Sequence, residues 1–235
     1  MKKSYRGIGL TIIFFVVFVM MLSIRVSTSQ CVNYQCQQFP IPLYLKMLDF
    51  FDRHLNYKRL AESIATRKLS EKERVRLFLA WTVEHIKSNP PGLPVVDDHA
   101  WHIIVRGYGV DDQFQDVFTT LCNYAGMEAF FTAVPSSDKS GRKSLSFVRV
   151  EKNWRVFDAY QGVYLKGSGD DFANLDEIAT GKFTAKAVGG RIPDFDYGKN
   201  LRVSGIKESA RDWFFSRAAI QSPLRRFRFW LKNRK

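Results

Sequence analysis

The stretch GVDDQFQDVFTTLCNYAGM, residues 109–127, decides the fold of this chain. Its apolar side chains recur every three or four residues, which is the spacing of one buried helix face. The residues on that face are Phe114, Val117, Phe118, Leu121, Cys122 and Ala125. Gly126 follows at a position where helices commonly end in a left-handed residue. The stretch is therefore predicted to form the central buried helix of the domain.

A second helix is predicted upstream, starting after Ser70. Ser70 and Glu73 match a capping box, in which each side chain bonds the backbone amide of the other residue. The apolar positions that follow at helical spacing are Val75, Phe78, Leu79, Thr82 and Ile86. Residues 89–92 (NPPG) end the pattern. Before this helix, residues 41–56 and 57–68 are interpreted as two helices that cover the core.

Downstream of the central helix the period of the pattern changes from 3.6 to two. Residues 127–134, 144–151 and 153–160 are rich in aromatic and β-branched side chains, which favours strands. Helices followed by neighbouring strands indicate an α+β fold, with the buried helix packed on an antiparallel sheet. Further helices are predicted over residues 175–180 and 208–221.

The formal charge of +13 is concentrated at the two ends of the chain. Residues 1–25 carry +4, the last 25 residues carry +7, and residues 26–210 carry only +2. A nearly neutral central domain offers little surface for a phosphate backbone. We therefore expect no nucleic-acid partner.

Residues 7–24 (GIGLTIIFFVVFVMMLSI) contain no charged side chain and are predicted to form one transmembrane helix. At helical rise they span roughly the ~30 Å of a hydrocarbon core. Lys2, Lys3 and Arg6 precede them, so the positive-inside rule keeps that end cytoplasmic and places the domain outside the cytoplasm.

Two other interpretations of the N-terminus remain open. Small residues at 27–29 suit a cleaved signal peptide, although the apolar stretch is long and Arg25 interrupts the approach to that site. A lipoprotein is disfavoured because Gln30 precedes Cys31, where a small residue is expected. The prediction is a single-pass protein of an inner or plasma membrane, with a periplasmic domain.

Cys31 and Cys36 are candidates for a disulfide, because an extracytoplasmic location permits oxidation. A metal site would need two more ligands nearby, and none is visible in the sequence. Cys122 lies on the apolar helix face and is interpreted as a small buried side chain. No metal or cofactor is predicted.

Four segments resemble transglutaminase-like and papain-like cysteine proteinases, in the order that this superfamily has them. GVDDQF (109–114) is similar to Gly-Val-Cys-x-x-aromatic, and LCNYAGM (121–127) is similar to Leu-x-x-x-Ala-Gly-Ile. LSFVRV (145–150) is similar to His-x-aromatic-Val-x-Val, and NWRVFD (153–158) is similar to Lys-Trp-x-x-Phe-Asp. With the capped helix, the resemblance covers about residues 70–160 and implies a papain-like, transglutaminase-like core.

The resemblance also implies which residues should form the catalytic triad. The superfamily has a cysteine at the helix start, a histidine on the following strand and an aspartate one strand later. The matching positions hold Asp111, Leu145 and Asp158, so only the aspartate is present. The proline that follows that aspartate in the family is Ala159 here. The sequence thus predicts a degenerate member without the catalytic cysteine and histidine.

Asp111 is a poor substitute for a cysteine, because a carboxylate is a weak acyl acceptor and its mixed anhydride hydrolyses readily. One interpretation is structural: a carboxylate at a helix start can cap free amides and complement the helix dipole. The other is chemical: Asp111 and Asp158 could share a proton or act as acid and base. Asp97, Asp98, His99 and His102 precede the helix and could contribute a base or ligands.

The C-terminal segment 223–235 alternates basic and aromatic residues. Its candidate contacts with a membrane surface are Arg225, Arg226, Phe227, Arg228, Trp230 and Lys232. A tail that packs on the domain, or one that binds a polyanion or a partner, remains an alternative.

The predicted order is a cytoplasmic end (1–6), the membrane helix (7–24), a linker with covering helices (25–69), the transglutaminase-like core (70–165), an extension (166–222) and the basic tail (223–235). The predicted function is non-catalytic binding or scaffolding of a peptide or glycan, or of a protein or other component of a bacterial cell envelope. Polysaccharide or peptidoglycan assembly is the setting we expect. The alternative is a hydrolase that uses Asp111, Asp158 and His99.

Overall fold

The computed structural model describes residues 2–32, 35–135, 142–169, 172–188, 194–201 and 231, with only the backbone of residues 2–7 and 135. Two predictions lie outside this part of the chain. They are the helix over residues 208–221 and the basic tail, with Arg225, Arg226, Phe227, Arg228, Trp230 and Lys232. The chain divides into two units, residues 1–55 and 56–235.

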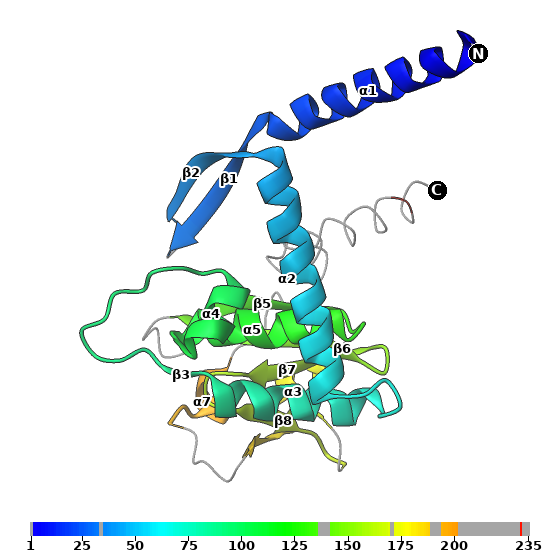
Figure 1. Ribbon diagram of the computed structural model, residues 1–235. Helices are drawn as coiled ribbons and strands as arrows, with labels where there is room; N and C mark the ends of the chain where they lie inside the picture. The colour runs from blue at the N-terminus through cyan, green and yellow to red at the C-terminus, as the bar shows by residue number, and fades with distance from the viewer. Residues whose placement is uncertain are drawn as a thin grey trace. The chain divides into compact units, whose positions relative to one another are not determined.

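The first unit contains helix α1 (Lys2–Ser23), strands β1 (Arg25–Val32) and β2 (Gln35–Pro42), and the start of helix α2 (Leu43–Ile64) (Figure 1). The strands form an antiparallel hairpin in which Cys31 lies opposite Cys36, and a disulfide joins them. At the base of the hairpin, the amide of Leu43 donates to the carbonyl of Ile24 at 2.8 Å.

The prediction of two helices over residues 41–56 and 57–68 was wrong, because one helix, α2, runs through this region. No glycine or proline lies between Leu43 and Ile64, so nothing in the sequence ends the helix at Asn56. The hairpin was also missed, since residues 25–40 were assigned to a linker and residues 41 and 42 to the start of a helix.

The large apolar side chains of α1 from Ile8 onward that the structure places are exposed, except for the half-buried Leu22. Within the described residues, no helix combines the length and the apolar character needed to cross a membrane.

After the end of α2, the second unit continues with α3 (Glu71–His85), whose start confirms the capping box. The Ser70 hydroxyl accepts from the amide of Glu73, and the Glu73 carboxylate accepts from the amide of Ser70. A short helix α4 (Ala100–Arg106) follows, flanked by the parallel pair β3 (Lys87–Ser88) and β4 (Tyr108–Gly109). The central helix α5 (Asp111–Tyr124) comes next, and Gly126 beyond it has a φ of 91°.

An antiparallel sheet of five strands follows, in the order β5-β6-β7-β8-β9. The first three are the predicted strands: β5 (Ala129–Pro135), β6 (Arg142–Val150) and β7 (Asn153–Asp158). β8 (Val163–Lys166) and β9 (Thr184–Ala187) were not predicted. Two short helices, α6 (Leu175–Ala179) and α7 (Tyr197–Asn200), complete the described part.

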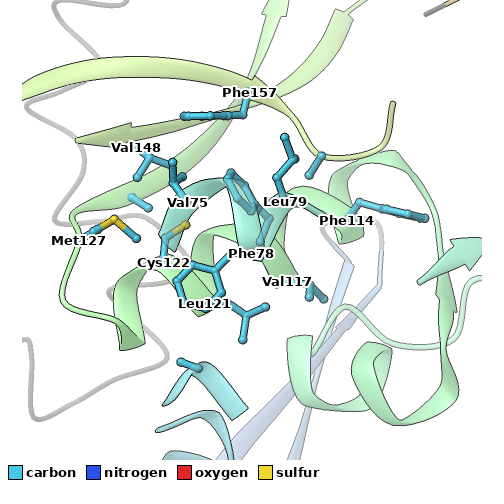
Figure 2. Packing of buried hydrophobic residues seen from close by; sticks show 14 of the residues in the cluster. Val75, Phe78, Leu79, Phe114, Val117, Leu121, Cys122, Met127, Val148 and Phe157 are labelled. Carbon is cyan, nitrogen blue, oxygen red and sulfur yellow. The ribbon is translucent and has the colours of Figure 1, made fainter. Parts of the chain in front are cut away.

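Two apolar clusters cover the two faces of this sheet. The first joins α5 and α3 to Val148 and Phe157 (Figure 2). It also includes Val150, together with Tyr57 and Ala61 from the second half of α2. The second contains Leu145, Phe147 and Val156 on the opposite face. Successive side chains of β6 therefore lie on opposite faces of the sheet. Ser146 and Val148 point toward α5, whereas Leu145 and Phe147 point away from it.

Candidate functional site

Asp111 is the first residue of α5, and its side chain is one-third exposed. Its Oδ2 accepts from the backbone amide of Ser144 at 3.3 Å, and its Oδ1 accepts from Nε2 of Gln115 at 3.4 Å. Among the described contacts, the Asp111 carboxylate makes no bond to the free amides of its own helix. Its interactions instead connect the start of α5 to β6.

Leu145, at the position that the family gives to histidine, is 1% exposed. Ser146 pairs with Phe157 across β6 and β7, so the next position of the same register sets Leu145 opposite Asp158. The two residues are thus neighbours, as the resemblance implied for the histidine and aspartate. The Leu145 side chain is aliphatic and packs in the second apolar cluster, so it supplies no proton acceptor.

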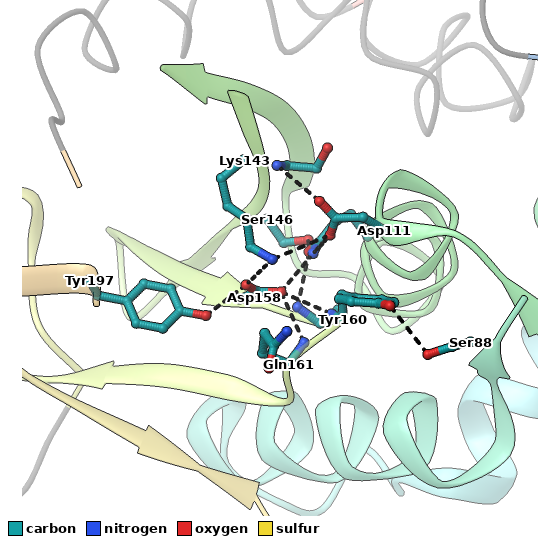
Figure 3. A network of polar contacts seen from close by, with 11 residues as sticks. Ser88, Asp111, Lys143, Ser146, Asp158, Tyr160, Gln161 and Tyr197 are labelled. Atoms are coloured by element: carbon teal, nitrogen blue, oxygen red, sulfur yellow. Dashed lines mark hydrogen bonds and ion pairs between the residues drawn. The ribbon is translucent and has the colours of Figure 1, made fainter. Parts of the chain in front are cut away.

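Asp158 is fully buried, and both of its oxygens have several partners (Figure 3). Oδ1 accepts from the amides of Tyr160 and Gln161 at 3.0 and 3.1 Å, and from Nε2 of Gln115 at 3.1 Å. Oδ2 accepts from the Tyr197 hydroxyl at 2.7 Å and lies 3.1 Å from Nζ of Lys143. A buried carboxylate needs such compensation, because an unpaired one would cost several kcal/mol.

Lys143 places a positive charge between the two carboxylates. Its Nζ lies 3.1 Å from Asp158 Oδ2 and 4.0 Å from Asp111 Oδ1. The same nitrogen faces the rings of Tyr160 and Phe195 at 5.3 and 5.9 Å from their centroids. The carboxylates therefore face a common cation, which weakens the repulsion that would favour a shared proton.

Gln115 connects the network to the sheet. Its Oε1 accepts from the Ser146 hydroxyl at 2.7 Å and from the amide of Ala159 at 3.0 Å. Its Nε2 donates to both Asp111 and Asp158. All four hydrogen-bonding positions of this buried amide are used, so its orientation is fixed.

Sequence reasoning missed Gln115, Lys143 and Tyr197. Two of them had a detectable signal. Gln115 lies four residues after Asp111 and so on the same side of the helix, and Lys143 lies two residues before Leu145 and so on the same face of the strand. Tyr197 had none, because it lies in a turn-rich region that the sequence left unassigned.

Burial is the main cause of the raised pKa of Asp111. The charge of Lys143 opposes this shift, and the charge of Asp158 adds to it. Burial, followed by the charge of Asp158, raises the pKa of Tyr197 above its usual range. The Tyr197 hydroxyl therefore remains protonated and serves as a donor.

The segment before α4 forms a separate polar cluster. His99 is the N-cap of α4, and its Nδ1 accepts from the amide of Trp101 at 3.3 Å. His102 Nδ1 contacts Asp97 Oδ2, and Asp98 Oδ1 accepts from Nε2 of Gln113 at 2.9 Å. Over the ranges described, no group of three or more His, Cys, Asp or Glu side chains is arranged to hold a metal ion.

A model of the transglutaminase-like superfamily matches residues 58–172, a range that contains Asp111, Lys143 and Asp158. Residues 58–172 form a transglutaminase-like domain. Tyr197 lies beyond this transglutaminase-like domain in sequence, yet bonds Asp158 within it.

Three solved structures are similar to the chain. One is described as a TGase, with 11% identity, a TM-score of 0.43, and coverage of 84% of this chain and 62% of the other. A provisionally described cysteine protease from Cytophaga hutchinsonii has 16% identity, a TM-score of 0.37, and coverage of 46% and 38%. A provisionally described protease from Parabacteroides distasonis has 9% identity, a TM-score of 0.37, and coverage of 57% and 35%. The chain thus spans less than two thirds of each of these proteins. No curated protein matches the sequence.

We expect Tyr197→Phe to destabilise the fold. The change removes the hydroxyl that donates to buried Asp158 at 2.7 Å. A hydrogen bond to a charged group contributes about 1.5–3 kcal/mol, so the free energy of unfolding in urea should fall by about that amount. Tyr44→Phe, at an exposed tyrosine of α2, is the control and should change it by less than about 0.5 kcal/mol. Equal effects of both changes would contradict this account.

Asp111→Asn should alter how stability depends on pH. A carboxyl whose pKa is raised by folding contributes most to stability below its unfolded value, and this contribution is lost as the pH rises through the folded value. Asparagine has no such loss. The free energy of unfolding of the variant, relative to the wild type, should therefore increase as the pH rises above 3.8. Urea titrations at a series of pH values measure this difference, and a decrease with pH would disprove the role assigned to burial.

Proposed function

We propose that this chain is a membrane-anchored, extracytoplasmic transglutaminase-like protein that binds or scaffolds a ligand and does not catalyse acyl transfer. The observation that carries the proposal is the state of its three cysteines. Cys31 and Cys36 form a disulfide, and Cys122 is fully buried within the apolar cluster around α5. Burial raises the pKa of the Cys122 thiol well above its usual value, which opposes formation of the nucleophilic thiolate.

The contacts of Asp111, Leu145 and Asp158 support the same proposal. Acyl transfer of this type needs a nucleophile and a base that removes its proton. Asp111 is a weak nucleophile, Leu145 has no titratable group, and Asp158 is bonded to Lys143, Tyr197, Gln115 and two backbone amides.

The same contacts disfavour a carboxylate hydrolase. Such an enzyme needs one carboxylate that is free to accept a proton from water. Asp158 has partners at both oxygens, and Lys143 stands beside both carboxylates. His99 accepts from the amide of Trp101 and so caps the start of α4, which gives this side chain a structural role.

The ligand that we propose is a peptide, a peptidoglycan stem or another polysaccharide or protein component of a bacterial cell envelope. This part of the proposal rests on analogy, because transglutaminase-like domains are built to recognise chains that carry amides. The Asp111 carboxylate and the Lys143 ammonium offer one acceptor and one donor to such an amide at the partly exposed end of the network.

Membrane attachment through residues 7–24 is a further part of the proposal. The exposed apolar side chains from Ile8 to Ile24 and the basic residues Lys2, Lys3 and Arg6 support it. We also propose that the basic tail, residues 223–235, contacts anionic lipid at the same membrane.

The absence of acyl transfer is tested with the full-length chain, a glutamine-containing peptide and a fluorescent primary amine. We expect no amine incorporation, no covalent adduct in the intact mass, and recovery of the peptide unchanged. Asp111→Asn should leave all three of these results unchanged. Turnover that Asp111→Asn abolishes while the fold persists would replace this proposal with the hydrolase.

The anchor is tested by alkaline carbonate extraction of membranes from cells that express the full-length chain. We expect the chain to stay in the membrane pellet with Lys2 and Lys3 still attached. A chain whose sequence begins just after Ser29 would show that the segment is a cleaved leader. Complete release of the full-length chain by carbonate would exclude a spanning helix.

A further inference from the structure

A groove of about 500 Å³ lies between α3 and the strands β8 and β9, and none of its lining residues belongs to the Asp111 network. Its apolar lining comes from Leu69, Leu77, Ala80, Tyr164, Ala187 and Val188. Two charged residues of α3, Glu73 and Arg76, complete it. The volume is in the range of small-molecule sites, which are mostly apolar with a few placed polar groups.

Arg76 is held in place by aromatic rings. Its guanidinium carbon lies 5.0 Å from the ring centroid of Phe172 and 5.6 Å from that of Tyr164. These two rings contact each other edge to face at 5.4 Å, and Phe172 is buried in the core. Within the described part of the chain, the Arg76 guanidinium forms no ion pair. The Arg76 guanidinium therefore lines the groove beside the Tyr164 ring, and its N–H groups can donate to an acceptor bound there.

A second cation lies on the same face of the sheet. Lys186 pairs with Tyr164 across β8 and β9, which places both side chains on one face and next to each other. Among the residues described, no carboxylate pairs with Lys186. Arg76 and Lys186 therefore flank Tyr164 with two positive charges.

Glu73, the one acidic residue among the described lining of the groove, already has hydrogen-bond partners. Glu73 accepts from the amide of Ser70 at 2.9 Å and from the Ser70 hydroxyl at 2.7 Å, as part of the capping box. These hydrogen bonds are the main cause of its lowered pKa. Glu73 thus caps the start of α3, and the net charge at the Tyr164 end of the groove remains positive.

We propose that this groove binds a small amphiphile with one aliphatic chain and one carboxylate head. The planar guanidinium of Arg76 matches a carboxylate in a bidentate arrangement, and Lys186 adds a second positive charge. The aliphatic chain lies against Leu69, Leu77 and Ala80. Charge complementarity and the apolar lining both favour this ligand, independently of the function proposed for the Asp111 site.

The test uses the full-length chain in a neutral, sugar-headed detergent and decanoate with a photoreactive diazirine on its chain. We expect labelling to map by mass spectrometry to residues 69–80 and 184–188. Unmodified decanoate should compete, whereas decanol, which has the same chain without the charge, should compete about tenfold more weakly.

Two variants test the charge of Arg76 and the apolar part of the groove separately. Arg76→Gln should reduce groove labelling about tenfold. Ala80→Trp should reduce it by filling the apolar part while Arg76 remains. Arg67→Gln, at an exposed arginine outside the groove, is the matched control and should leave labelling unchanged.

Thermal unfolding verifies that each variant is folded. Labelling confined to α1 or α2, equal competition by decanol, or labelling that neither Arg76→Gln nor Ala80→Trp reduces would each overturn the proposal.

Discussion

The pairing of the buried Asp158 carboxylate is the interaction on which the rest of this site depends. Its oxygens contact side chains from α5, β6 and α7, which lie in separate parts of the sequence, and amides of the turn that directly follows β7. Transfer of an ionised carboxylate out of water is costly, and only a nearly complete set of donors offsets it. The same set therefore fixes how the start of the central helix meets the ends of two strands.

Full pairing has a chemical consequence. A triad aspartate acts by orienting a histidine, and it needs a free lone pair on the side that faces that histidine. Here Lys143 and the Tyr197 hydroxyl contact Oδ2 of Asp158. Leu145, at the histidine position, packs in the second apolar cluster. The donors that stabilise Asp158 thus occupy the oxygen atoms that a histidine in such a triad would contact.

The sequence predicted what depends on local periodicity and failed where distant segments meet. The helix from Asp111 and the box at Ser70 follow from spacing and capping chemistry, and the first three strands follow from alternation. Asp158 was identified because the motif around Trp154 is local. Tyr197 reaches Asp158 from 39 residues away, and no periodic pattern encodes such a contact. β8 and β9 are four residues each, too short for alternation to stand out, and the hairpin over residues 25–42 carries mostly polar side chains.

That hairpin is closed at its base, where the amide of Leu43 bonds the carbonyl of Ile24. The hairpin between α1 and α2 is therefore cross-linked by the Cys31–Cys36 disulfide, and one hydrogen bond joins the two ends of the chain at its base. The end of α1 and the start of α2 thus lie next to each other, and the hairpin forms a branch at this junction. Such a branch can lengthen or shorten in evolution without changing the junction between the helices, which makes it a tolerant place for sequence drift and for an inserted tag.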